Sequence, residues 1–146
     1  MSLCKPALLA LAVVLWPLAV AAAPAKLKVG DFAPQFSRGD LQGQVFDLRA
    51  QRGKVVLIDF WASWCPPCII EIPHLITLEK QFGARGLRIV GISMDDSAAP
   101  TRETMRKAVF NYPVVMGDAK FGNLYGGVLG LPLRYLIGAD GKILTI

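Results

Sequence analysis

The sequence is poor in the residues that build metal sites and cross-linked scaffolds. Its 146 residues include three cysteines and one histidine, His74. Cys4 precedes an apolar stretch at the N-terminus, so the rest of the chain keeps Cys65 and Cys68. A structural zinc site takes four protein ligands, and a ring with only two residues between its cysteines constrains the unfolded chain little. The sequence therefore argues against a zinc domain and against a fold stapled by disulfides.

Runs of one charge sign are missing as well. Charged residues make up 18% of the chain, and the formal net charge of +5 comes from scattered positions. No run of Lys and Arg is interleaved with aromatic residues, so we do not expect a nucleic-acid partner. The small basic excess supports no more than a weak preference for anionic surfaces.

A long membrane-spanning run is also absent. The main apolar stretch, residues 6–20, is shorter than the about 20 residues that cross a bilayer comfortably. It follows Lys5 and ends in three alanines, which is the layout of a secretory signal peptide. We expect residues 1–23 to be such a signal, or an uncleaved N-terminal anchor. Cleavage would remove Cys4 together with the signal.

The two remaining cysteines belong to the motif Trp64-Cys65-Pro66-Pro67-Cys68. The C-x-x-C spacing alone fits either a metal site or redox chemistry. Its setting favours redox chemistry, because an almost unbroken apolar strand over residues 54–61 leads into it and the two prolines stand where a helix would begin. In an exported protein, a cysteine pair too close to act as a staple is there to be reduced and reoxidised.

The periodicity of apolar residues predicts a layered α/β domain with a partly parallel sheet, because strands alternate with helices. Pro73 is expected to kink the first helix, and Met105, Val109 and Phe110 to form the apolar stripe of the second. No helical pattern follows the last strand, so one face of the sheet is expected to lack a cover. The predicted elements are a hairpin within residues 30–48, strands over 54–61, 87–94 and 113–116, helices over 66–82, from Pro100 and around 121–128, and a final hairpin over 133–146.

Several motifs together resemble the thioredoxin superfamily. They are the segment from Asp59 to Cys68, Pro73 and Gly130-Leu131-Pro132. Within that superfamily the opening Gly30-Asp31-x-Ala33-Pro34, the Glu71-x-Pro73 triplet and the insert around residues 95–116 are similar to the exported TlpA/ResA-like thiol-disulfide oxidoreductases. The resemblance implies a thioredoxin-like domain over residues 28–146, with an N-terminal hairpin and a central helix-strand insert. Because that family ends its fold with a helix, it also implies a C-terminally truncated domain here.

The resemblance and the chemistry of helix termini assign different tasks to the two cysteines. Cys65, just ahead of the helix, is the expected exposed nucleophile, because the positive end of the helix dipole and the free amides near Cys68 and Ile69 stabilise its thiolate. Cys68, one turn deeper, is expected to resolve the mixed disulfide. The sequence does not give the reduction potential. Pro66 has no amide hydrogen to donate to the Cys65 sulfur, and this loss reduces the stabilisation of the thiolate by an amount that the sequence does not define.

Two carboxylates are candidate proton acceptors for Cys68. The resemblance matches Asp59 to the buried aspartate of thioredoxins and Glu71 to an acidic position of ResA-like proteins. Either could take the proton as Cys68 attacks. The alternatives are a solvated charge at a strand end for Asp59 and an ordinary exposed helix charge for Glu71.

The resemblance also suggests residues that hold the substrate. Pro132 matches the cis-proline that faces the dithiol, which would leave the Leu131 backbone available to an extended substrate segment. Trp64 is expected at the rim, with Trp61 either beside it or in the core. The chain departs from the family after Pro132, where the usual threonine is Leu133 and Arg134 follows. His74, by contrast, is expected to face solvent.

The resulting hypothesis is an exported thiol-disulfide oxidoreductase that reduces protein disulfides, for example those of apocytochrome c, with the Cys65–Cys68 disulfide as its only redox group. Its expected partners are exported disulfide proteins and a membrane electron-transfer protein that supplies reducing equivalents, and the protein itself is expected to be a monomer. Its expected location is the periplasm or an equivalent extracytoplasmic space, with a possible tether to the inner membrane. Two alternatives are a thiol peroxidase and a copper-handling module. The peroxidase is disfavoured because such sites have a threonine three residues before the attacking cysteine, and this chain has Ala62 there.

Overall fold

A computed structural model describes residues 26–146 of the chain. The expected signal, residues 1–23, lies outside the described residues. None of the helices in the described part is long and apolar enough to cross a membrane.

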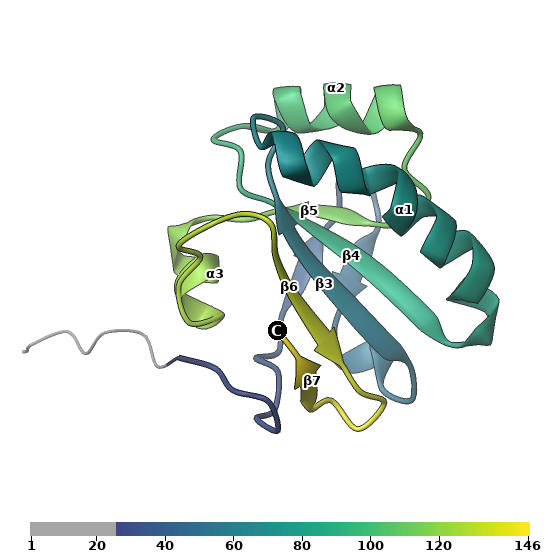
Figure 1. Ribbon diagram of the computed structural model, residues 1–146, viewed down its shortest axis with the longest axis vertical. Helices are drawn as coiled ribbons and strands as arrows, with labels where there is room; N and C mark the ends of the chain where they lie inside the picture. Colours follow the sequence, from purple (N-terminus) through teal and green to yellow (C-terminus); the bar gives the residue numbers. More distant parts are fainter. Residues whose placement is uncertain (1–25) are drawn as a thin grey trace, which may run out of the picture.

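A five-stranded mixed sheet forms the centre of the domain (Figure 1). Its order is β5-β4-β3-β6-β7, in which β3, β4 and β5 run parallel and β6 and β7 are antiparallel to their neighbours. The strands are β3 (Val55–Trp61), β4 (Leu87–Ser93), β5 (Val114–Met116), β6 (Leu133–Ile137) and β7 (Ile143–Thr145). The apolar run of β3 follows from its central place between β4 and β6, since a strand in the middle of a sheet that is packed on both faces has side chains buried on both sides.

Helices and a hairpin pack against the two faces of this sheet, but no helix of the described residues lies in front of β6 and β7 in Figure 1, in agreement with the expectation that one face lacks a full cover. The helices are α1 (Pro66–Phe82), α2 (Ala98–Ala108) and α3 (Ala119–Leu124), and the hairpin consists of β1 (Ser37–Gly39) and β2 (Val45–Asp47). Short 3-10 turns follow β2 at Arg49–Gln51 and α1 at Gly83–Arg85. The predicted thioredoxin-like fold, with its N-terminal hairpin and a helix-strand insert of α2 and β5, is confirmed.

Alternation along β3 divides the interior into two cores. Trp61 packs with Ile72 and Leu75 of α1, whereas Ile58 and Phe60 belong to the opposite core. Successive side chains of a strand point to opposite faces, so residues 57, 59 and 61 share the face that α1 covers. The opposite core is rich in aromatic rings from β3, from β6 and from the hairpin and α3 with their flanking residues, namely Phe36, Phe46, Phe60, Phe121, Tyr125 and Tyr135.

Three details of the predicted helices change. Helix α2 begins at Ala98, two residues before Pro100, and a proline in the first turn fits because amides there lack helical partners. Val109 ends α2 at a φ of 54° with 76% of its surface exposed, so it does not belong to the buried stripe. Helix α3 stops at Leu124, and the glycines Gly126 and Gly127 follow at positive φ, which halts helical winding.

Both edges of the sheet are covered by backbone from the N-terminal part of the chain. Gly30 donates a hydrogen bond to the Ile143 carbonyl at 2.8 Å, and the Ile143 amide donates to the Asp31 carbonyl at 2.9 Å. At the other edge, the Leu41 amide donates to the Val114 carbonyl at 2.8 Å. These contacts leave few unpaired strand groups for pairing with another chain. After β7 the described residues include no further helix.

Candidate functional site

The two cysteines meet at the N-terminus of α1, where the structure joins them in a disulfide with a Cα–Cα distance of 5.3 Å. Cys65 is the N-cap residue of the helix, and the Cys68 amide donates to its Sγ at 3.4 Å. Pro66 and Pro67 have no amide hydrogen, so the Cys68 amide is the first in the helix that can donate. The second expected amide, that of Ile69, donates instead to the Cys65 carbonyl at 3.1 Å. One amide and the helix dipole therefore remain to stabilise a Cys65 thiolate after reduction.

The expected exposure of Cys65 is wrong for the disulfide form. Cys65 is 4% exposed and Cys68 is 2% exposed, because neighbouring side chains cover both sulfurs. The two are nevertheless unequal. Cys65 lines a groove of about 550 Å³, and Cys68 does not contribute to its wall. A partner that enters this groove meets Cys65 first.

The groove beside the disulfide is apolar. Trp64 and Leu129 stand at its rim with 67% and 98% of their surfaces exposed. Trp61 takes the core position, fully buried, with its ring tilted against that of Phe110 at 5.4 Å between ring centroids. No charged side chain lines the groove, so it suits an apolar segment. Its lining residues are Trp64, Cys65, Pro66, Pro67, Met94, Val128, Leu129, Gly130 and Leu131.

The loop before β6 supplies the far wall of the groove. The Leu131–Pro132 peptide bond is cis, as the sequence predicts. Leu131 lines the groove, and within residues 26–146 neither its amide nor its carbonyl has a hydrogen-bond partner. An extended peptide could pair with these two groups in the manner of an added strand.

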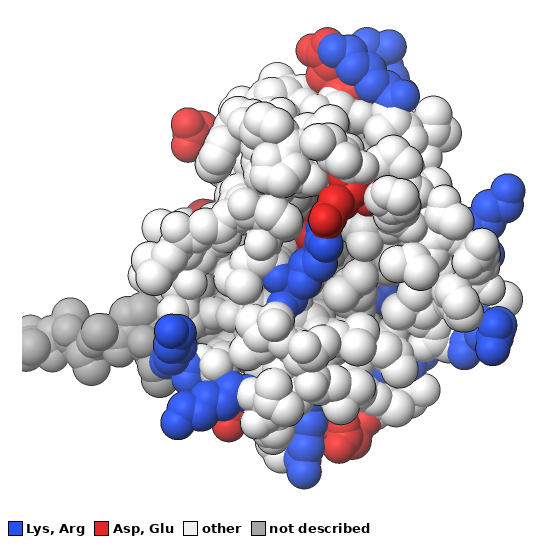
Figure 2. Space-filling view, viewed as in Figure 1, with Lys and Arg blue, Asp and Glu red and all other residues white. Residues whose placement is uncertain are grey.

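The two predicted carboxylates are joined by a third residue, Arg134. Its Nε donates to Asp59 Oδ1 at 2.7 Å, and its Nη1 is in contact with Glu71 Oε2. Asp59 is only 2% exposed, so it is not a solvated strand end. The Glu71 side chain is 42% exposed and forms an ion pair. Figure 2 shows a basic and an acidic side chain in contact near the middle of this face, while most other charged groups lie toward its rim.

Burial has the largest effect on the pKa of Asp59. Loss of solvent raises the pKa of the Asp59 carboxyl above its ordinary value, while the charge and hydrogen bond of Arg134 lower it and the Glu71 charge raises it. A carboxyl group whose pKa is raised by burial can exchange a proton closer to neutral pH than a solvated aspartate can.

Asp95 is a buried acidic residue to which the sequence analysis assigns no role. Its carboxylate is 4% exposed and accepts hydrogen bonds from the Ser63 amide at 3.1 Å, the Ser63 hydroxyl at 2.9 Å and the Thr101 hydroxyl at 2.6 Å. Ser63 lies two residues before Cys65, so Asp95 ties the loop of the dithiol to α2. No local pattern distinguishes Asp95 from Asp96, which is exposed.

Arg134 had a signal in the sequence. It is the only charged residue in the predicted strand over residues 133–137, and it lies two positions after Pro132. A charged side chain in an apolar strand needs a partner. The partner could not be named without knowing which strand lies alongside. His74 is exposed, as predicted.

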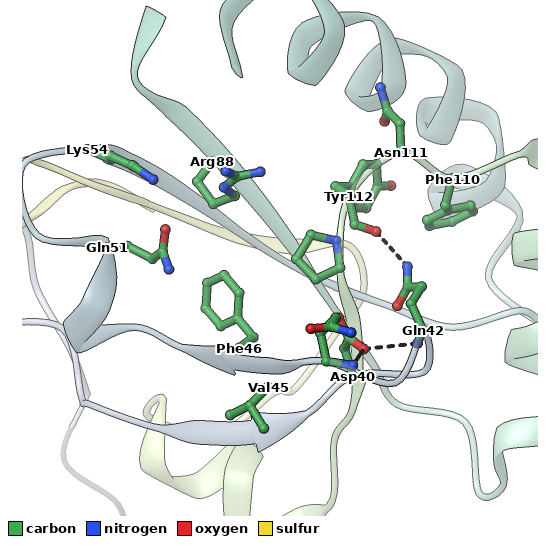
Figure 3. Close-up of a pocket in the computed structure, with 12 residues that line it drawn as sticks. Asp40, Gln42, Val45, Phe46, Gln51, Lys54, Arg88, Phe110, Asn111 and Tyr112 are labelled. Carbon is green, nitrogen blue, oxygen red and sulfur yellow. Dashed lines mark hydrogen bonds between the residues drawn. The ribbon is translucent and has the colours of Figure 1, made fainter. Parts of the chain in front are cut away.

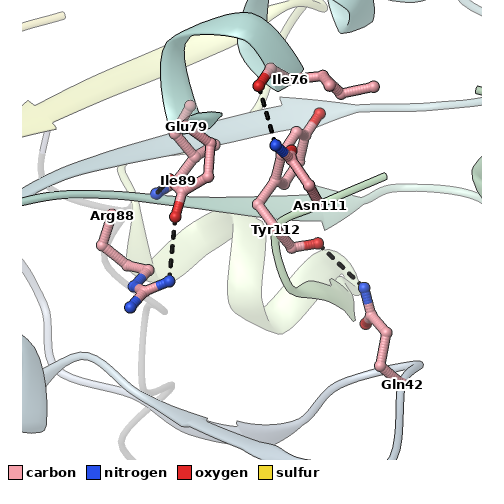
Figure 4. Close-up of polar contacts among 7 residues, drawn as sticks. All are labelled: Gln42, Ile76, Glu79, Arg88, Ile89, Asn111 and Tyr112. Carbon is pink, nitrogen blue, oxygen red and sulfur yellow. Dashed lines mark hydrogen bonds and ion pairs between the residues drawn. The ribbon is translucent and has the colours of Figure 1, made fainter. Parts of the chain in front are cut away.

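A second hollow lies at the other end of the sheet (Figure 3). It measures about 500 Å³ and has a polar wall that includes Lys54, just before β3, and Arg88, at the start of β4. Glu79 of α1 accepts hydrogen bonds there from the Ile89 amide at 2.8 Å and from Arg88 at 3.0 Å (Figure 4). The disulfide follows the opposite end of β3, and the two hollows share no lining residue. In residues 26–146 no group of three or more His, Cys, Asp or Glu side chains is arranged to hold a metal ion.

Sequence comparison places the chain among known redox proteins. Residues 29–146 match the AhpC/TSA family. The thiol-disulfide oxidoreductase ResA of Bacillus subtilis (strain 168) is 32% identical over 129 residues, which cover 88% of this chain and 72% of that protein. ResA of Bacillus thuringiensis subsp. konkukian is 31% identical over 121 residues, which cover 82% of this chain and 69% of that protein.

Solved structures share the fold. A DsbE-type thiol:disulfide interchange protein from Chlorobium tepidum has a TM-score of 0.77 at 31% identity, over 82% of this chain and 84% of that one. A secreted disulfide oxidoreductase of Mycobacterium tuberculosis, homologous to DsbE of E. coli, has a TM-score of 0.67 at 26% identity, over 76% of this chain and 81% of that one.

Proposed function

The chain belongs to the AhpC/TSA family, as a thiol-disulfide oxidoreductase of the ResA/DsbE kind with a C-x-x-C pair, and from this premise we propose that it reduces disulfides of exported proteins. One observation supports this most directly. A disulfide caps the N-terminus of α1 and borders an apolar groove through Cys65 alone. A polypeptide that enters the groove reaches one sulfur and leaves the other for the second step.

The reaction needs two electrons, which the reduced Cys65–Cys68 pair supplies. The Cys65 thiolate attacks one sulfur of the substrate disulfide, a mixed disulfide forms, and the first substrate thiolate leaves. Cys68 then loses its proton and attacks Cys65 Sγ. The second substrate thiolate leaves, and the enzyme is left with the disulfide that the structure contains.

The surrounding residues suit these two steps. Asp59 is buried on the face of the sheet that carries α1, and burial raises its pKa, so we assign it as acceptor of the Cys68 proton with Glu71 as the second candidate. Leu131 offers an unpaired backbone amide and carbonyl to an extended segment, next to Pro132 and in the groove that Trp64 also lines. The apolar lining favours substrate cysteines that have apolar neighbours.

We propose that the enzyme works outside the cytoplasm. A similar Mycobacterium tuberculosis protein is secreted, and the apolar residues 6–20 have the layout of an export signal. In an oxidising compartment a reductase stays active only if electrons are supplied, so we propose a membrane electron-transfer protein as its reductant. Apocytochrome c is the substrate that we propose first, and we expect the enzyme to act as a monomer.

Trapping of mixed disulfides tests this proposal. In an extract of the exported proteins of the source cells, the full-length Cys68→Ser variant should retain substrates as mixed disulfides on Cys65, because the residue that releases them is missing. Mass spectrometry after non-reducing electrophoresis identifies the trapped proteins. Cys65→Ser is the matched control and should trap far less. Equal trapping by both variants would reverse the roles of the cysteines, and trapping by neither would refute reduction of exported proteins.

A further inference from the structure

Arg134 is an unusual residue for its position in the fold. It is the only charged residue of β6, whose other members are Leu133, Tyr135, Leu136 and Ile137. Three of those side chains belong to or pack against the aromatic core on the face away from α1. Arg134 points to the other face, where it meets α1 and β3.

The geometry around Arg134 is that of a built ion cluster. In the strand register Asp59 of β3 lies directly opposite Arg134, and its neighbour on the other side is Gly91 of β4, which has no side chain. The Trp61 indole fills the space beside Gly91, since a Cβ placed there would come within 2.9 Å of Trp61 Nε1. Within the described residues, Arg134 is therefore the only cation in contact with Asp59, and it carries the hydrogen bond to Oδ1 at 2.7 Å.

The second carboxylate connects the cluster to the dithiol. Glu71 lies three residues after Cys68 on α1, one helical turn away, and it pairs with the same guanidinium. The Arg134 side chain is 29% exposed, so it spans from the buried Asp59 to the partly exposed Glu71. No side-chain hydrogen bond within residues 26–146 involves the other oxygen of Asp59, Oδ2. That oxygen remains available for a proton.

We propose that Arg134 is a positioning residue for the resolving step, which holds Asp59 as an anion and in a fixed orientation so that its free oxygen can take the Cys68 proton. This inference rests on the proposed function, in which Cys68 resolves the mixed disulfide. The proton moves from Cys68 Sγ to Asp59, the new bond forms between Cys68 Sγ and Cys65 Sγ, and the bond from Cys65 to the substrate sulfur breaks. Arg134 exchanges no proton and no electron.

The charges that face Asp59 give the direction of the effect. They are Arg134 from β6 and Glu71 from α1, and the Asp59 charge in turn acts on Tyr112 in the segment before β5. Burial and Glu71 raise the pKa of Asp59, and Arg134 alone lowers it. Burial raises the pKa of the Tyr112 phenol, so that group stays neutral. Without Arg134 the Asp59 carboxyl would hold its proton to a higher pH and could not accept another.

The test follows the resolving step as a function of pH in the full-length enzyme. Reduced protein is mixed with dithiobis(nitrobenzoate), whose coloured thiolate is released once when Cys65 attacks and again when Cys68 resolves. The second phase in stopped-flow gives the resolving rate between about pH 5 and pH 9. For Arg134→Met we expect the inflection of this rate to move to higher pH, with a rate about tenfold below wild type near pH 6, while the first phase changes less. Arg134→Lys should fall between the two.

Arg88→Met is the matched control, because Arg88 also pairs with a buried carboxylate, Glu79, but at the other end of the sheet. It removes an ion pair of similar exposure and should leave the inflection unchanged. In an Asp59→Asn background, Arg134→Met should produce no further shift, since the group on which it acts is gone.

The outcomes separate this inference from the proposed function. If wild type shows both phases and Arg134→Met has the wild-type inflection, Arg134 is only structural and the inference is wrong. If Arg134→Met does not fold, a wild-type inflection in Arg134→Lys overturns it equally, because the donors of lysine all leave one nitrogen and cannot reproduce the fork that binds Asp59 through Nε and Glu71 through Nη1. If Cys68→Ser still gives the second phase, the proposed roles of the cysteines fail instead.

Discussion

Asp59 combines a buried position with the charge that the resolving step needs. A carboxylate with 2% exposure loses solvation, and a single arginine restores only part of it. Residues of this kind trade stability for activity, because a neutral side chain of the same shape would be easier to bury.

Asp59→Asn should therefore separate stability from activity. The folded-state pKa of Asp59 is raised above the ordinary 3.8, so the native state binds more protons than the unfolded state in the window above about pH 4. Wild-type stability falls as pH rises through that window. The asparagine variant avoids this loss, so its free energy of unfolding relative to wild type should increase from pH 4 to pH 7 in urea titrations.

The same variant should resolve mixed disulfides about 100-fold more slowly at neutral pH, the usual effect of removing a general base. Stopped-flow measurement of the second thiolate release checks this. Glu71→Gln serves as control and should slow the step much less. The opposite ranking of the two variants would make Glu71 the proton acceptor.

At the scale of elements, the dithiol depends on contacts between segments that are distant in sequence. The loop from Ala62 to Trp64 connects β3 to α1, and its position is held by Asp95, 32 residues later than Ser63. Because Asp95 also accepts from Thr101 in α2, the helix-strand insert supports the loop that presents Cys65. The insert therefore acts on the site through hydrogen bonds and without touching the sulfurs.

We expect Asp95→Ala to lower the free energy of unfolding by about 3 kcal/mol, because it leaves the Ser63 amide and two buried hydroxyl groups without their charged acceptor. Urea titration measures this loss. The loosened loop should also slow the attack of Cys65 on dithiobis(nitrobenzoate). Asp96→Ala, at the adjacent exposed position, should change neither property. If both alanine variants behave alike, the hydrogen bonds of Asp95 contribute nothing to the loop.

At the scale of the whole molecule, the two ends of the sheet have separate tasks. The carboxyl end of β3 carries the disulfide, and the other end carries the Glu79 contacts with Arg88 and the Ile89 amide. Strand β5 pairs with β4 only from Gly91 onward, so Glu79 takes the place of a strand at the unpaired part of β4. A carboxylate that binds an amide and a guanidinium protects this edge from water.

Glu79→Ala should destabilise the fold without changing the chemistry. Loss of a buried carboxylate that satisfies the Ile89 amide should lower the free energy of unfolding by about 2 kcal/mol. Both phases of the reaction with dithiobis(nitrobenzoate) should keep their wild-type rates in the folded variant. Glu103→Ala is the control, because that residue forms only an exposed pair with Lys107, and its unfolding should match wild type. A slower thiol reaction in Glu79→Ala would show that the two ends of the sheet are coupled.

Much of this fold can be read from local patterns. The apolar run over residues 54–61, the helical spacing over residues 66–82 and the strand over residues 133–137 recur in the structure with shifts of one residue or none. They were predictable because the periodicity of apolar residues and the positions of proline and glycine determine the conformation of residues close to them in the sequence. The boundaries of α2 and α3 were less predictable, since short helices depend more on tertiary contacts than on propensity.

The sequence by itself determined the dithiol at the start of a helix, the strand that leads into it and the proline after Leu131, because each depends on neighbouring residues. Only the tertiary structure decided that Arg134 meets Asp59 across 75 residues of chain, that Glu71 shares this arginine, and that both cysteines are covered in the disulfide form. Those contacts depend on which strand lies beside β3 and in what register. A shift of one residue would turn Arg134 to the opposite face, and no local pattern carries that information.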